Sequence, residues 1–309
     1  MVSPDSILVP RRSFLSGALA SLSLLGRTAA ARPARSAPGT PRKHRILSCN
    51  IRVPLPRDDR AGHGWKDRRE VCARVIASHD PDLIGLQECY GVQLEFLKKR
   101  LPGFESFGQA APGPVFNPLN AILYSRSRYS LVSAGGFWLS ETPHVAGSSS
   151  WDSARPRWVN WVDLRDRASG AVFRFWNTHL DHKGAEARRR QARMIVEAAA
   201  PYGEIPQILA GDLNTDASAL PVRILEEGGW KDTYTAVHGP GDPGFTYHAF
   251  KGDRYRSKRR KGKIDWIFCR GGFRPAAAEI IKDHPGGVYP SDHYFLSADL
   301  VLEPRKEGK

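Results

Sequence analysis

This sequence predicts an α/β fold in which two β-sheets are each covered on the outer face by helices. Three observations support that prediction. The chain has 309 residues, 41% of them hydrophobic and 25% charged, so it can bury a sizeable core. Segments with the periodicity of strands alternate along it with segments of helical periodicity. The apolar strands also end repeatedly in Asn, Asp, Glu or His, which is typical of a ligand site at the edge of an α/β sheet.

Residues 1–40 are set apart from the fold, because they predict an export signal followed by a Pro/Ala/Arg-rich linker. The pair Arg11 and Arg12 precedes a weakly apolar stretch that is too short to span a membrane. The arrangement is similar to a twin-arginine signal, with the alanines at 29–31 as a cleavage site. A disordered basic leader is the alternative. We therefore expect an exported protein, periplasmic or extracellular, without a transmembrane segment in its mature chain, and one domain over residues 44–303.

The first part of this domain alternates strands and helices. Residues 44–53 are rich in aliphatic and β-branched side chains and predict a strand. Residues 65–79 carry apolar side chains at helical spacing, and residues 80–88 form a second short apolar run. A further helix is predicted over residues 91–101, where Pro-Gly follows as a stop signal.

The middle of the domain favours strands, and its last part mixes both kinds of element. Four segments have the pattern of strands: residues 120–126, 129–140, 157–166 and 171–181. A helix over residues 184–200 would place four residues on one face: Ala187, Gln191, Met194 and Ala198. A strand, a helix and two more strands complete the prediction, at residues 206–214, 219–229, 263–270 and 292–302.

The charge of the chain indicates acidic partners. A net charge of +14 and a pI near 9.9 favour nucleic acid, phosphorylated metabolites or an anionic lipid surface, against the alternative of an indifferent basic surface. Residues 251–263 hold eight Lys or Arg and one acid, and they lead into the strand that carries Asp265. That run would overhang a site at the strand's end, unless it is only a solvated loop. The cysteines lack metal-binding spacing and are expected to be core residues, with no disulfide assumed: Cys49, Cys72, Cys89 and Cys269.

Polar residues at six strand edges mark the candidate site. They are Asn50; Gln87 and Glu88; Asn177, His179 and Asp181; Asp212 and Asn214; Asp265; and Asp292 and His293. Any one of them could instead cap a helix or shape a turn, as Asn214 and Asp216 could for the segment that follows them. Six edges with such groups together favour one shared cleft.

This set of side chains suits the hydrolysis of a phosphate ester. A hard cation such as Mg²⁺ prefers oxygen ligands and keeps several waters, so one or two carboxylates with amide support suffice. Enzymes accelerate such hydrolysis by up to about 10²¹, whereas one general acid or base contributes roughly 10²–10⁴. Several groups must therefore act together, and the clustered strand ends provide them.

The ordered motifs SCNIR, IGLQE, NTHLD, GDLN, KIDWIF and SDHYF resemble the endonuclease/exonuclease/phosphatase superfamily over about residues 44–303. The stretches GGFWLSETP and SSSWDSARPRW are similar to a largely bacterial, uncharacterised branch of it. The resemblance implies a deoxyribonuclease I-like fold: a four-layer α/β sandwich of two mixed β-sheets packed face to face, with helices on both outer faces and a cleft at one edge. It also implies a Mg²⁺-dependent phosphoesterase, with Mn²⁺ as the other candidate ion. We expect a monomer.

The resemblance also implies roles for individual residues. Glu88 would be the principal metal ligand, with Asn50 beside it and Asp292 near the metal. Asp212 would orient or deprotonate the attacking water, and Asn214 would hold a phosphate oxygen.

Two histidines complete the implied site. His179 would donate to the phosphoryl group, while His293, oriented by Asp265, would contact the phosphate or share the proton transfer. Which of His293 and Asp212 is the base stays open, so we treat them as a coupled pair. Three residues are expected to support the site: Gln87, Asn177 and Asp181. Two further histidines could line the cleft, although a position at the surface is the favoured interpretation for both: His182 and His248.

One position departs from a known pattern. Arg52 stands where the apurinic-endonuclease branch carries an aspartate, which implies a different phosphate environment. The expected function is an exported, divalent-metal-dependent hydrolase of phosphate esters, either a phosphodiesterase or phosphatase or a nuclease. The alternative is a non-catalytic binding module on the same fold that recognises phosphorylated polymers or an anionic membrane. The intact set of Glu88, Asp212, Asp265 and His293 argues against that alternative.

Overall fold

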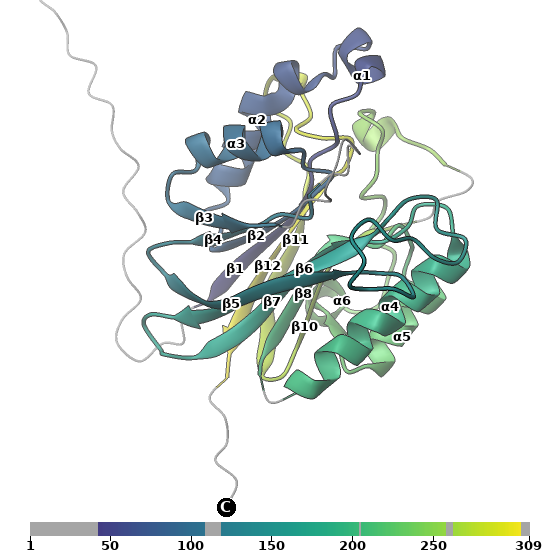
Figure 1. Ribbon diagram of the computed structural model, residues 1–309. Coiled ribbons are helices and arrows are strands. Elements are labelled where there is room, and N and C mark those ends of the chain that lie inside the picture. The colour runs from purple at the N-terminus through teal and green to yellow at the C-terminus, as the bar shows by residue number, and fades with distance from the viewer. Residues whose placement is uncertain (1–42, 109–118, 204, 258–261, 304–309) are drawn as a thin grey trace, which may run out of the picture. The chain divides into compact units, whose positions relative to one another are not determined.

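The computed structural model describes residues 43–108, 119–203, 205–257 and 262–303, which form two six-stranded sheets with helices around them (Figure 1). The predicted signal and linker of residues 1–40 lie outside the described residues. The first sheet has the order β11-β12-β1-β2-β4-β3. Its strands are β1 (His44–Asn50), β2 (Leu83–Gln87), β3 (Phe104–Phe107), β4 (Ile122–Ser125), β11 (Phe273–Ile281) and β12 (Phe295–Leu302).

The second sheet has the order β5-β6-β7-β8-β10-β9. Its strands are β5 (Tyr129–Trp138), β6 (Trp158–Asp166), β7 (Val172–His179), β8 (Gln207–Asp212), β9 (Lys231–Asp232) and β10 (Asp265–Arg270). The helices are α1 (Pro56–Arg60), α2 (Trp65–Ser78), α3 (Gly91–Arg100), α4 (Ala185–Ala199), α5 (Leu220–Glu227) and α6 (Thr233–His238). Among the described residues, none of the helices is both long and apolar enough to cross a membrane.

Each sheet contains one pair of parallel strands near its centre. These two pairs determine where the site lies. β1 pairs with β2 in parallel, β7 pairs with β8 in parallel, and the other neighbouring strands are antiparallel. Parallel strands bring their carboxyl ends to the same edge of a sheet. Asn50 is therefore opposite Gln87 in one sheet, and His179 is opposite Asp212 in the other.

Three apolar layers hold the elements together. Side chains from both sheets, such as Ile46 of β1 and Ile208 of β8, form the inner layer. The helices α2 and α3 pack on the outer face of the first sheet, and α4 and α5 pack on the outer face of the second. Figure 1 shows these helix pairs outside the two facing sheets. The predicted four-layer α/β sandwich of two mixed sheets is confirmed.

Details of the elements differ from the sequence prediction. The buried face of α4 includes Ala187 and Gln191 as predicted, but it continues through Ile195, while Met194 and Ala198 are only partly buried at its margin. β10 begins at Asp265, two residues later than the predicted strand of residues 263–270. The short β3 and β9, the edge strand β11, and the helices α1 and α6 were not predicted. All four cysteines are buried, as expected for core residues, and their thiols are free.

A buried ion pair beneath the second sheet gives a stability prediction. Asp232 accepts hydrogen bonds from the N–H groups of Tyr234 and Thr235 at the start of α6, and its Oδ1 lies 2.8 Å from Lys263 Nζ. Burial lowers the pKa of Lys263 to about 8, although Asp232 opposes this. Asp232→Ala should lower the free energy of unfolding by about 3–5 kcal/mol, because it leaves a buried ammonium unpaired. Urea titration measures this loss.

The exposed pair of Glu95 and Lys98 is the control for that measurement. Its side chains are 61% and 43% exposed, with Oε1 and Nζ 2.9 Å apart. Glu95→Ala should change the free energy of unfolding by less than about 1 kcal/mol. Equal effects of the two substitutions would show that the buried pair has no special role.

Candidate active site

The carboxyl ends of the two parallel pairs bring the predicted polar residues to one edge of the facing sheets. Asn50 ends β1, and Glu88 directly follows β2. His179 and Asp212 end β7 and β8, side by side in the second sheet. Asn50 Nδ2 is 3.0 Å from Asp212 Oδ2, so the two sheets meet at these side chains.

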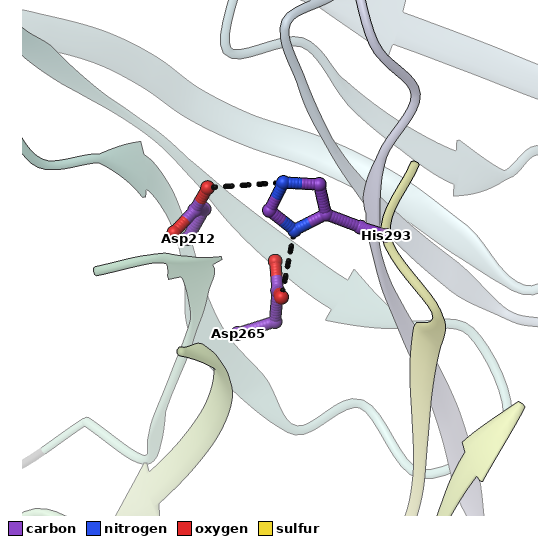
Figure 2. Close-up of side chains that lie close together, drawn as sticks. All are labelled: Asp212, Asp265 and His293. Carbon is purple, nitrogen blue, oxygen red and sulfur yellow. Dashed lines mark hydrogen bonds and ion pairs between the residues drawn. The ribbon is translucent and has the colours of Figure 1, made fainter. Parts of the chain in front are cut away.

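His293 lies between two aspartates of the second sheet. Figure 2 shows its ring pointing at Asp212 through one nitrogen and at Asp265 through the other. Its Nδ1 is 2.9 Å from Asp265 Oδ2, and its Nε2 is 3.9 Å from Asp212 Oδ2. Asp265 and Asp212 are direct partners in the pairing of β10 with β8, whereas His293 precedes β12 of the first sheet. The group therefore joins both sheets.

The charges of this group are strongly coupled. Burial alone would lower the pKa of His293, but Asp265, Asp212 and Asp292 raise it to about 10. Burial and Asp265 raise the pKa of Asp212 to about 7, against the influence of His293. Such a pair titrates as a unit. The neighbouring carboxylates favour the protonated form of His293, while burial and Asp265 raise the affinity of Asp212 for a proton.

His179 and Asn214 form a polar group on the other side of Asp212. His179 Nε2 lies 3.4 Å from Asp212 Oδ2 and 2.9 Å from Asn214 Nδ2. The backbone N–H of Asn214 donates to Asp212 Oδ1 at 2.8 Å, with Asn214 in the left-handed region at φ 51°. A non-glycine residue in this region marks a backbone held by its surroundings. By contrast, Asp216 only accepts bonds from Ser218 in a surface turn.

Glu88 faces the same place from the first sheet. Its Oε1 lies 3.4 Å from Asn50 Nδ2, and its Oε2 accepts the N–H of Val53 at 3.1 Å. Burial works to raise its pKa, but Arg52 and His293 hold the pKa of Glu88 below its ordinary value. The side chain is therefore an anion next to Asn50 and Asp212.

Asp292 is buried at the first-sheet side of the site. Its Oδ2 is 3.3 Å from Arg52 NH1, and its side chain is 3% exposed. Burial raises the pKa of Asp292, while His293 and Arg52 oppose that effect. All eight predicted site residues thus lie in one connected cluster, and their chemical roles stay predictions.

The donor atoms of this cluster fit a hard divalent cation. Glu88 and Asp212 offer carboxylate oxygens, which Mg²⁺ and Mn²⁺ prefer, while Asn50 turns its Nδ2 toward both carboxylates and its amide oxygen accepts the N–H of Arg52. Within the described part of the chain, the buried Oδ1 of Asp265 has no hydrogen-bond partner. One ligand atom each from Asp212, Asp265 and His293 lie within 4.8 Å of one another. His293 Nδ1 already contacts Asp265. We therefore favour the carboxylate oxygens around Glu88 as the cation site over the group of Asp212, Asp265 and His293.

The supporting residues predicted from the sequence lie around the cluster. Gln87 Nε2 donates to Asn177 Oδ1 at 2.7 Å and so links the two sheets directly beneath Glu88. Asp181 accepts the N–H groups of Ala154, Lys183 and Gly184, which orders the chain after β7.

The expectation for His248 was wrong, and that for His182 holds only in part. His248 is 1% exposed and packs against Tyr294, with ring centroids 4.2 Å apart. Burial and His293 lower its pKa to about 4, so it is a neutral core histidine. The side chain of His182 is 34% exposed, and its Nδ1 is 3.1 Å from Arg157 NH2.

Arg157 is a site residue that the sequence analysis missed. It is 7% exposed, and its Nε lies 3.6 Å from Asp181 Oδ2. Burial lowers its pKa, while Asp181, Glu88 and Asp212 oppose this through their charges. The signal was present in the motif PRW, because an arginine at the start of an apolar strand needs a buried anionic partner.

Comparison with known proteins agrees with this geometry. The chain belongs to the Endonuclease/Exonuclease/phosphatase family, whose model matches residues 47–293. Members of this family are hydrolases of phosphate esters.

Individual relatives cover most of the chain. A family protein from Bacteroides thetaiotaomicron has a TM-score of 0.76 and 29% identity, covering 86% of this chain and 100% of that one. The mannosyl-6-phosphatase of the same organism has a TM-score of 0.75 and 29% identity, covering 84% and 99%. Nocturnin of Drosophila melanogaster is 26% identical over 289 residues, which cover 79% of this chain. The matched region spans only 43% of that Nocturnin.

Proposed function

We propose that this protein is a divalent-metal-dependent hydrolase of phosphate esters. The proposal rests on the position of Asp212 at the centre of the cluster. Its Oδ2 lies 3.0 Å from Asn50 Nδ2, 3.4 Å from His179 Nε2 and 3.9 Å from His293 Nε2. A carboxylate between an oxygen-rich cation site and two imidazoles suits the activation of water for attack on phosphorus.

Each side chain has a defined task in this proposal. Asp212 orients the attacking water and takes its proton, while His293, held by Asp265 and favoured as an imidazolium, contacts the phosphate. His179 and Asn214 donate to a non-bridging oxygen as negative charge develops on it. When bound by Glu88 and Asn50, with Asp292 nearby, a divalent cation supplies Lewis acidity at a phosphoryl oxygen.

A sugar phosphomonoester is the leading candidate substrate. The support is the 29% identity with the mannosyl-6-phosphatase of Bacteroides thetaiotaomicron, which extends over 99% of that chain. Arg157 adds a buried guanidinium beside the cluster, and a guanidinium suits the charge of a phosphate monoester.

A substrate panel tests the proposal. It contains mannose 6-phosphate, p-nitrophenyl phosphate, bis-p-nitrophenyl phosphate, DNA, RNA, a phosphoinositide and sphingomyelin, each assayed with Mg²⁺ and with Mn²⁺. We expect hydrolysis of at least one compound, and loss of that hydrolysis in Asp212→Asn. Binding of phosphorylated compounds without hydrolysis of any would favour the non-catalytic module instead.

Nucleic acid is a second candidate substrate, favoured by a chain of ring contacts. The ring of Tyr247 packs edge-on against His293, with centroids 5.1 Å apart, and against Tyr255, with centroids 5.4 Å apart. Tyr255 belongs to the basic run of residues 251–263, so the described start of that run lies close to the cluster. Aromatic side chains beside basic ones suit a single-stranded polymer.

Four residues of the basic run allow a test, although Lys258, Arg259, Arg260 and Lys261 lie outside the described residues. Each phosphate that a cation neutralises adds about 0.9 to the salt slope for duplex DNA, or about 0.7 for single strands. Changing all four to Ser should flatten the salt dependence of nucleic-acid cleavage by about two to four units. Hydrolysis of bis-p-nitrophenyl phosphate should not change.

The same variant separates the remaining interpretations. Equal losses on both substrates would indicate a folding or metal-site defect. A loss confined to anionic vesicles would favour a membrane phosphodiester, because each cation near such a surface contributes about 1 kcal/mol. No loss on any substrate would indicate that the basic run of residues 251–263 is only a solvated loop.

Export through the twin-arginine route is proposed from the sequence of residues 11–31, in which an arginine pair precedes an apolar stretch and a small-residue cleavage site. A receptor reads such a signal, so Arg11→Lys with Arg12→Lys should retain the precursor inside the cell. Immunoblots of the cell and export fractions measure this. Undiminished export of the double variant would mean that another route carries the protein.

A further inference from the structure

Arg52 is fixed in an unusual conformation two residues after β1. Its φ is 59°, in the left-handed region that a non-glycine residue adopts only when its surroundings require it. Its N–H donates to Asn50 Oδ1 at 3.1 Å. Its carbonyl accepts from Arg68 NH2 at 2.6 Å and from Gln93 Nε2 at 2.9 Å. Three side chains thus hold the backbone that aims the guanidinium.

The guanidinium contacts two carboxylates on the first-sheet side of the site, and the charge of a third, Glu88, attracts it. Nε and NH2 contact the two oxygens of Asp58 at 2.8 and 3.3 Å, and NH1 lies 3.3 Å from Asp292 Oδ2. Burial works to lower the pKa of Arg52, but Asp58, Asp292 and Glu88 together raise it, and the charge of Arg52 in turn helps to lower the pKa of Glu88 against its burial. The Arg52 side chain is only 14% exposed, so solvent screens these charges weakly.

The charged side chains on the first-sheet side of the site suit the binding of one added cation. Asp58, Asp292 and Glu88 face the guanidinium of Arg52, and the buried guanidinium of Arg68 also attracts Asp292 and Asp58, so little negative charge is left for more than one divalent cation. An aspartate in place of Arg52 would leave far more negative charge, enough to attract a second ion. The two-pronged contact of Arg52 with Asp58 also orients the third nitrogen toward Asp292.

We propose that Arg52 is a positioning residue that holds Asp292 beside Glu88, and that its guanidinium takes the place of a second cation, so that the site binds one divalent ion. This inference rests on the metal requirement of the proposed function. It also explains why an arginine is compatible with a cluster of acids that would otherwise repel one another.

Counting bound Mn²⁺ by electron paramagnetic resonance on the full chain tests the inference without any substrate. The wild type should bind one Mn²⁺, which Mg²⁺ displaces. Arg52→Met removes the positive charge but keeps a side chain of similar length. The number of Mn²⁺ ions bound by this variant should rise to two. Arg52→Lys keeps the positive charge but loses the two-pronged contact with Asp58. This variant should still bind one Mn²⁺ ion, with an affinity roughly 10–100-fold lower than that of the wild type.

Arg57→Met is the matched control, because Arg57 lies 3.7 Å from the same Asp58 but is 68% exposed. The Arg57→Met variant should bind as many Mn²⁺ ions as the wild type, and with the same affinity. Two ions in the wild type, or one ion with unchanged affinity in Arg52→Met, would overturn the inference. If Arg52→Met does not fold, Arg52→Lys decides, since unchanged affinity there also overturns it. If the substrate panel shows no hydrolysis while these counts hold, the proposed function fails and the inference on Arg52 stands.

Discussion

Asp212→Asn should lower kcat for a phosphate ester by about 10³–10⁴-fold, the upper part of the range for one general base. The substitution keeps the shape of the side chain but removes the negative charge that lies 3.0 Å from Asn50 Nδ2 and 3.9 Å from His293 Nε2. The attacking water then loses its proton acceptor. Because Asn can keep the hydrogen bond from the N–H of Asn214, the fold should change little. Steady-state kinetics with circular dichroism measure both effects.

Asp216→Asn is the control for this variant. Asp216 undergoes the same chemical change four residues further along, but it only accepts bonds from Ser218 in a turn. Its kcat should stay within about twofold of the wild type, on the scale of a surface substitution. Similar losses in the two variants would show that the carboxylate of Asp212 has no special part in the reaction.

Glu88→Gln should lower turnover by at least about 10²-fold at moderate Mg²⁺ and should raise the Mg²⁺ concentration needed for half-maximal rate. Glu88 is held as an anion by Arg52 and His293, and a neutral amide at this place removes the charge that retains the cation. Glu95→Gln on the exposed face of α3 is the control and should change neither quantity. An unchanged Mg²⁺ requirement in Glu88→Gln would move the cation site to the group of Asp212, Asp265 and His293.

Much of the site could be predicted because its residues interrupt strongly apolar strands. β1, β2 and β8 are buried on both faces, so a polar residue at their ends stands out in the sequence. Parallel pairing then brings Asn50 next to Gln87 and His179 next to Asp212.

Some contacts of the site join residues far apart in the sequence. The motif PRW indicates that Arg157 needs a buried acid but not that this acid is Asp181, and no local pattern reveals that Arg52 pairs with Asp292. His248 stands in a segment rich in glycine and tyrosine that resembles a surface loop. Its N–H and that of Ala249 donate to the carbonyl of Asp292, which draws the ring into the core.

The missed strands have weak local signals. β11 contains Pro275 and three alanines, which disfavour a strand in isolation. It forms at the sheet edge by antiparallel pairing with β12, with a change of register between Pro275 and Ala277. Tertiary pairing therefore outweighs local propensity there, as it does for the two residues of β9.

We propose one cation-dependent site that uses residues from both sheets, and removal of the metal is the sharpest test of it. The protein is dialysed against EDTA, and hydrolysis of the best substrate of the panel is followed while Mg²⁺ or Mn²⁺ is added back. We expect a loss of at least about 10²-fold in EDTA and full recovery with the added ion. Undiminished hydrolysis in EDTA would contradict the claim.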